Sequence, residues 1–221
     1  FMKKLTFGII VTLLCAVCAA ALFGCSDGGA FNAGNKSFSS IKNIDVSVRD
    51  REIEITASDD ETVQIEYFEN DKEYYEIEAD ENGNLTVKLA ADKKWTDFIS
   101  TKPDAQYRRL VIKIPAGLTG LNVATTNETI SLSSVSAVSA VLNSNGGDVS
   151  FDKLSVSESL DVTVKNGNIT GSVTGGWDDF SITSAIKKGK SNLPAEKTGG
   201  SKILKASCNN GDINVEFLKE S

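Results

Sequence analysis

The sequence predicts an all-β protein, and more narrowly a single-stranded β-solenoid with coils of about 20 residues. Short segments such as NIDVSVRDREIEIT, TVQIEYF, NLTVKLA and LVIKIPAG alternate apolar and polar residues, and each ends at Asp, Asn, Gly or Pro. Turn strings of one type, SNGGDVSF, KNGNITG and CNNGDINV, recur in the C-terminal half. No amphipathic helix of useful length follows the first 24 residues, so we expect no significant helix in the folded domain.

Residues 1–24 are predicted to be a lipoprotein signal peptide. Two lysines precede an uncharged run over residues 5–24, which stops at the string LFGC. This arrangement resembles a bacterial lipoprotein signal, in which the peptide is cleaved before the cysteine and the thiol carries lipid. Cys25 is therefore the expected lipidation site. The alternative is a single transmembrane helix, since about 20 apolar residues can span a bilayer.

The rest of the chain is predicted to form a tether and one domain. Residues 25–38 are rich in Gly, Ser and Asn without an apolar period, which is typical of a flexible tether. Residues 39–221 are expected to form the solenoid domain, with acidic strands over 39–115 and regular repeats over 116–221. With Cys25 lipidated, Cys208 has no disulfide partner and is expected to be a small core residue.

The repeat can be counted from the apolar residue that follows each turn. These residues are Ile130, Val149, Ile169, Leu193 and Ile213, so the spacing is near 20 residues and the fourth unit is longer. The positions before each turn also carry apolar residues of similar size, as stacked coils require.

Asn-Gly turns are compatible with both hairpin tips and solenoid corners, because either one resets the alternation of the strand. The two models differ in strand pairing. A solenoid places Val162 beside Leu142 in a parallel pair, whereas a meander of hairpins places Val164 opposite Ile169 in an antiparallel pair. The repetition of residue size at unit spacing favours the solenoid.

The string IKNIDVSVRDREIEITASDDETVQIEY, then NLTVKLA, LVIKIPAGLTGLNVATTNETISL and the serial Asn-Gly turns resemble the bacterial putative-adhesin domain of unknown function. This family is similar to the GIN adhesin head-domain family. The resemblance covers residues 38–217 and implies a β-solenoid of the cell envelope. Its motifs are structural, so they point to a fold and not to an activity.

Few residues suggest catalysis or a cofactor. The chain has no histidine, which excludes Ser-His-Asp and Cys-His catalysis, and no cofactor or metal is expected. Asp148 and Asp212 follow glycine as in calcium-binding turns, but the acids recur only once per coil. The mature chain would carry 21 basic and 30 acidic residues, net −9, which disfavours nucleic acid as a partner.

Two tryptophans are the remaining candidates for ligand contact. Trp95 lies in an aromatic insert over residues 93–107, and Trp177 lies in the string GGWDDF. Each ring can stack on a sugar, or it can cover an open end of the coil stack.

The sequence therefore predicts a lipid-anchored, extracytoplasmic protein that is not an enzyme and acts by surface contact. It would be held at the bacterial cell membrane, or at the outer membrane of a cell with two. Its partners would be the membrane, through the lipid, and a glycan or protein of the envelope or of a host surface. The alternatives are an envelope polysaccharide lyase or glycosidase with a β-helix fold, and an extracytoplasmic scaffold of a membrane complex.

Overall fold

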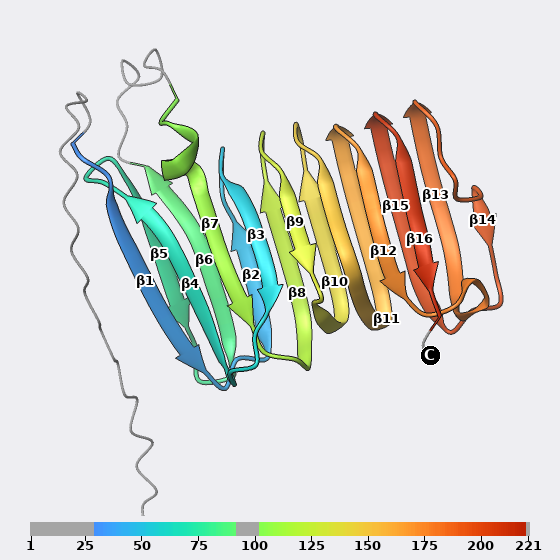
Figure 1. The fold of residues 1–221 in the computed structure, drawn as a ribbon, viewed down its shortest axis with the longest axis horizontal. Helices are drawn as coiled ribbons and strands as arrows, with labels where there is room; N and C mark the ends of the chain where they lie inside the picture. Colours follow the sequence, from blue (N-terminus) through green and yellow to red (C-terminus); the bar gives the residue numbers. More distant parts are fainter. Residues whose placement is uncertain (1–28, 92–101, 220–221) are drawn as a thin grey trace, which may run out of the picture.

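The computed structural model describes residues 29–91 and 102–219, and these form two β-sheets that pack face to face (Figure 1). The described chain contains no α-helix; its helical segments are the two short 3-10 turns η2 (Ala105–Arg108) and η3 (Trp177–Asp179). Sheet A contains β1 (Asn32–Ser39), β3 (Glu52–Ala57), β4 (Thr62–Glu69), β7 (Arg109–Ile114), β9 (Ile130–Ser133), β12 (Ile169–Thr174) and β16 (Ile213–Leu218). Sheet B contains β2 (Asn43–Ser47), β5 (Glu73–Ala79), β6 (Asn84–Ala91), β8 (Leu118–Thr125), β10 (Ser136–Ser144), β13 (Phe180–Lys188), β14 (Glu196–Lys197) and β15 (Lys202–Asn210).

Each coil consists of a sheet B strand, a corner and a sheet A strand, as in β2–β3, β6–β7, β8–β9 and β15–β16. The long strand β11 (Val149–Asn166) serves two coils, because its first part pairs with β9 in sheet A and its second part with β10 in sheet B. Leu142 is the parallel partner of Val162, and Val149 pairs with Ile130 and Ile169. This register confirms the solenoid with coils of about 20 residues, and the hairpin meander is wrong.

The core lies between the two sheets and runs the length of the stack. Inward residues of successive sheet B strands lie side by side, and Val46, Val123, Leu142 and Val162 are fully excluded from solvent. Cys208 is buried in the next inward row, beside Val164, and makes no disulfide. A row of equal positions explains the equal residue sizes seen in the sequence, since each side chain packs on its counterpart one coil away.

The order of coils in space differs from their order in the chain at both ends. The C-terminal coil β15–β16 lies between β11–β12 and β13, so Ile169 contacts Ile213 and not Leu193. The first coil, β2–β3, likewise lies between β6–β7 and β8–β9. The sequence order of the repeats therefore gives neighbours only in the middle of the stack.

The predicted tether needs a correction, because most of its second half is strand. Residues 32–38 belong to β1, which pairs antiparallel with β4 along its whole length. Gly34 is required there by packing and not by flexibility: a Cβ atom at this position would lie 2.5 Å from the ring of Tyr67. The edge strand is polar on its exposed side, so its sequence has little apolar alternation to reveal it.

The corners between the sheets are stacked by hydrogen bonds between coils. The amide of Asn166 donates to the backbone oxygen of Asn145 (3.3 Å), and Asn210 Nδ2 donates to Asn166 Oδ1 (2.6 Å). Asn210 is the register partner of Asn166. Side-chain amides thus hold the coils together at the point where strand pairing stops.

Candidate functional site

Two of the predicted site residues, Cys25 and Trp95, lie outside the described residues. Trp177 is described, in η3 between β12 and β13. Its ring stands edge-on to Phe217 with centroids 5.1 Å apart, and Lys197 Nζ lies 5.6 Å from its centroid. Phe217 in turn packs on the buried Phe180. This geometry favours the capping interpretation of Trp177, because one edge and one face are already in contact with the protein.

The aspartates that resemble calcium-turn residues form a ladder between coils. Asp148 accepts a hydrogen bond from the backbone N–H of Asn168 (2.7 Å), and Asn168 accepts one from the N–H of Asp212 (2.9 Å). Asp212 then accepts the N–H of Lys190 (2.7 Å). Each oxygen satisfies a backbone donor of the next coil. Within the described part of the chain, no group of three or more acidic or cysteine side chains could hold a metal ion.

A buried ion pair lies in the core near the N-terminal end of the stack. Arg51 is 1% exposed, and its guanidinium donates to Glu73 Oε2 at 2.6 Å. The hydroxyl of Tyr75 is buried nearby, and desolvation raises its pKa to about 12 against the opposing effect of Arg51. Solvent hardly reaches this cluster, so it is not open to a ligand.

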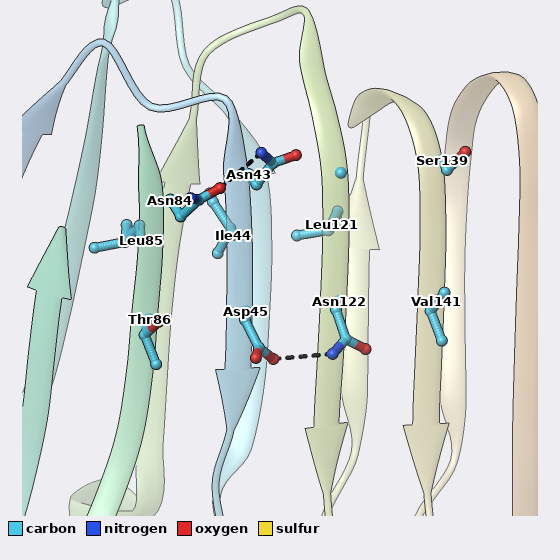
Figure 2. Close-up of a pocket in the computed structure, with 11 residues that line it drawn as sticks. Asn43, Ile44, Asp45, Asn84, Leu85, Thr86, Leu121, Asn122, Ser139 and Val141 are labelled. Atoms are coloured by element: carbon cyan, nitrogen blue, oxygen red, sulfur yellow. Dashed lines mark hydrogen bonds between the residues drawn. The ribbon is translucent and has the colours of Figure 1, made fainter. Parts of the chain in front are cut away.

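The outer face of sheet B carries a shallow depression of about 410 Å³ that crosses β6, β2, β8 and β10 (Figure 2). Its polar side chains come from outward positions of these strands, and residues one strand apart are in register. Leu85, Ile44 and Leu121 contribute only at the floor, since their side chains are buried in the core. The site is thus a rigid sheet surface and not a loop.

Two hydrogen-bonded pairs order the side chains of this depression. Asn43 Nδ2 donates to Asn84 Oδ1 at 2.8 Å, and Asn122 Nδ2 donates to Asp45 Oδ1 at 2.9 Å (Figure 2). Within the described structure, Asp45 Oδ2 and Asn122 Oδ1 have no further partner and face solvent. The carboxylate and the amide are joined by this hydrogen bond, and each leaves one acceptor oxygen open to a ligand.

Small and apolar positions shape the depression between these pairs. Gly120 has no side chain, and the Asn43 amide oxygen lies 2.9 Å from where its Cβ would be. Val141, on the next strand, is 38% exposed. At the outer rim, hydrogen bonds from Asn84 hold the pKa of Asp80 below its usual value. The surface therefore combines several polar groups with one exposed apolar contact.

The sequence did not single out these residues. The available signal was an Asn or Asp at outward positions of the segments NIDV, NLTV and LNVA, which the alternation already identified as strands. Their meeting depends on β2 lying between β6 and β8, and this pairing joins residues 41 and 77 positions apart.

The fold and repeats agree with one family model, Toastrack DUF4097, which matches residues 41–221. The chain belongs to this family. It is similar to a solved structure of a putative cell adhesion protein from Clostridium sporogenes, at 11% identity and TM-score 0.57, over 85% of this chain and 100% of the other. Two putative adhesins are also similar: one from Bacteroides fragilis (15% identity, 88% and 100% coverage, TM-score 0.38) and one from Parabacteroides distasonis (13%, 85% and 97%, TM-score 0.27).

No curated protein matches the chain. The family is a domain of unknown function, and the structure from Clostridium sporogenes shows a similar fold. Among residues 29–91 and 102–219, no helix is long and apolar enough to cross a membrane.

Proposed function

We propose that this Toastrack protein is a lipid-anchored, extracytoplasmic binding module that holds hydroxyl-rich surface molecules, such as glycans, in the depression on sheet B. It acts by contact and not by catalysis. The observation that carries this proposal is the hydrogen-bonded Asp45–Asn122 pair, whose outer oxygens face solvent beside the exposed Val141.

The chemistry of the depression fits a sugar ring. Hydroxyl groups of a sugar can donate to a carboxylate oxygen and to an amide oxygen, and Asp45 and Asn122 each leave one such oxygen open to solvent. The C–H face of the ring would cover Val141. The acceptors lie on paired strands, so little conformational entropy is lost on binding.

The proposed location has two supports. The sequence over residues 2–25 resembles a lipoprotein signal, which would attach Cys25 to the outer face of a membrane. The similar protein from Clostridium sporogenes is described as a putative cell adhesion protein, which fits display outside the cell.

The test is a glycan array probed with the full chain, followed by titration of any sugar that binds. Asp45→Ala and Asn122→Ala remove the paired acceptors, and we expect each to weaken binding at least about tenfold. Gly120→Leu keeps both acceptors and fills the depression, so it should weaken binding as well. Asn214→Ala is the matched control, since Asn214 is equally exposed on the outer face of sheet A.

Three outcomes would overturn the proposal. They are failure to bind any glycan on the array, equal binding by the three sheet B variants and the control, and cleavage of the bound sugar in a hydrolysis screen. Mass spectrometry of the protein from its native cell tests the lipid anchor separately. If residues 5–24 are retained, the anchor is contradicted and the binding proposal is not.

A further inference from the structure

The two ends of the coil stack carry opposite charge. Strands β1, β4, β5 and β6 form the N-terminal end, and β13, β14 and β15 lie at the opposite end of the long axis (Figure 1). Residues 32–39 and 58–91, which make the first end, contain 3 basic and 11 acidic residues, net −8. Residues 175–219, which make the second end together with η3 and β16, contain 7 basic and 5 acidic residues, net +2. The folded domain is therefore strongly acidic at one end of its axis and weakly basic at the other.

Each end also presents a sheet edge with open pairing capacity. Among the described residues, β5 is the last strand of sheet B on the acidic side, and its one pairing partner is β6. On the basic side, β14 covers β13 at two positions, Ile182 and Thr183, and the Ser184 N–H is taken by Ala195. Residues 185–188, at the end of β13, pair with β15 and with no other strand that the structure describes.

Exposed charges stand on both open edges. Glu76 and Glu78 point outward from β5, and Lys187 and Lys188 end β13. None of the four takes part in an ion pair within the described structure. Charged residues on an edge strand oppose pairing with an end of like charge. Contact between two acidic ends, or between two basic ends, is opposed by charge repulsion. Contact between an acidic end and a basic end is therefore the favourable arrangement of two copies.

We propose that a second copy of this chain docks head to tail, with the β5 edge of one copy against the β13 edge of the next. β5 runs antiparallel to β6, and the strands from β6 to β13 are parallel to one another, so the new pair would be antiparallel and would continue sheet B from copy to copy. The contact joins two different surfaces and does not close, so it builds linear chains. The outer face of sheet B, with its depression, stays accessible along such a chain.

The experiment is sedimentation velocity of the full chain in a neutral detergent, over a range of protein concentration and at low and high salt. We expect species larger than the monomer that grow with concentration and dissociate in high salt, since the contact is electrostatic. Glu76→Lys/Glu78→Lys and Lys187→Glu/Lys188→Glu should each abolish association. The chain that carries all four substitutions should associate again, because its ends are again complementary. Thermal melts verify that each variant is folded, and all four positions are exposed.

A monomeric wild-type chain at low salt would overturn the proposal. Association that survives in both charge-reversed pairs, or that is not restored in the fourfold variant, would show that these edges are not the contact. Binding of an anionic polymer such as polyphosphate to the basic end, without any self-association, would replace the second copy by a polyanionic partner.

Discussion

Gly167 shows how closely successive coils approach each other at a corner. Its φ is +146°, a region that residues with a side chain rarely adopt, and a Cβ atom would lie 2.6 Å from the backbone oxygen of Gly147 in the coil below. Gly211 repeats the arrangement on Gly167 one coil further along the stack. The Asn-Gly string therefore recurs because each corner must admit the backbone of its neighbour.

The first prediction separates close approach from backbone conformation. Gly117 also has positive φ (+87°), but a Cβ there would meet no atom within 4 Å. We expect Gly117→Ala to lower the free energy of unfolding by about 1 kcal/mol through strain alone. Gly167→Ala should cost about 1–3 kcal/mol more, because the corner is overpacked. Urea unfolding measures both, and equal losses would mean that the coils can move apart freely.

A second prediction concerns alkaline stability and Tyr75. Its pKa is about 12 in the folded protein against 10.0 for an ordinary tyrosine, mainly because burial disfavours the phenolate. As the pH rises above 10, the unfolded chain loses this proton first, so the contribution is intact below pH 10 and is lost towards pH 12. Unfolding of Tyr75→Phe should therefore depend less steeply on pH over this range. A slope unchanged from wild type would place the Tyr75 hydroxyl in water.

At the scale of a single element, β1 shows that a polar segment can be structural. Its exposed positions are small or polar, and its partner β4 supplies the apolar residues Val63, Ile65 and Tyr67. Pairing eliminates the open edge of β4, which would otherwise expose unpaired backbone groups. The domain thus begins near Asn32, before the boundary at residue 39 that composition predicted.

The third prediction compares two neighbours in β1. Gly34→Val introduces a side chain into the space occupied by the Tyr67 ring, and we expect a loss of about 1–3 kcal/mol in unfolding free energy. Ala33→Val adds a similar group at an exposed position and should be nearly neutral. Thermal melts give the comparison, with about 2–4 °C expected for each kcal/mol. If neither substitution changes the melting temperature, residues 32–38 do not pack as a strand and belong to the flexible tether.

At the scale of the whole molecule, the coil order is the main feature beyond the repeat. After β12 the chain skips one position in the stack and forms the outer strand β13. It then returns, so that β15 pairs between β11 and β13, and β16 pairs with β12. The first coil is enclosed in the same way by β6–β7 and β8–β9. Both ends of the repeat region are therefore held between other coils, which protects them from fraying.

A fourth prediction tests this order by disulfide trapping. Asp161 and Lys205 are direct parallel neighbours in sheet B, and their Cα atoms should lie about 4.8 Å apart, within disulfide range. Asp161 and Thr183 are two strands apart, because β15 lies between them. In a Cys208→Ser background, Asp161→Cys with Lys205→Cys should cross-link under mild oxidation, as seen by peptide mass spectrometry. Preferential cross-linking of Asp161→Cys with Thr183→Cys would indicate stacking in chain order.

The sequence also predicts only part of the candidate site. Alternation placed Asn43, Asp45 and Asn122 on the outer face of strands, because a period of two assigns faces without reference to any partner. It could not show that the first two meet Asn84 and Asn122 across strand pairs, since pairing partners are set by long-range packing. The sequence identified Trp177 as a candidate either for stacking on a sugar or for covering an open end, and only its contacts with Phe217 and Lys197 favour the cap.

The sequence by itself determined the all-β class, the coil length, the inward residues and the glycine corners. Each of these follows from local periodicity or from backbone conformation, which a short stretch of chain encodes. Only the tertiary structure decided the order of the coils, the strand β1 and the depression on sheet B. Coils of one length with similar inward residues can stack in more than one order at similar energy in the middle of the stack. The choice rests on the few contacts that differ, such as Gly34 on Tyr67 and the aromatic cluster of Trp177, Phe217 and Phe180 at the opposite end.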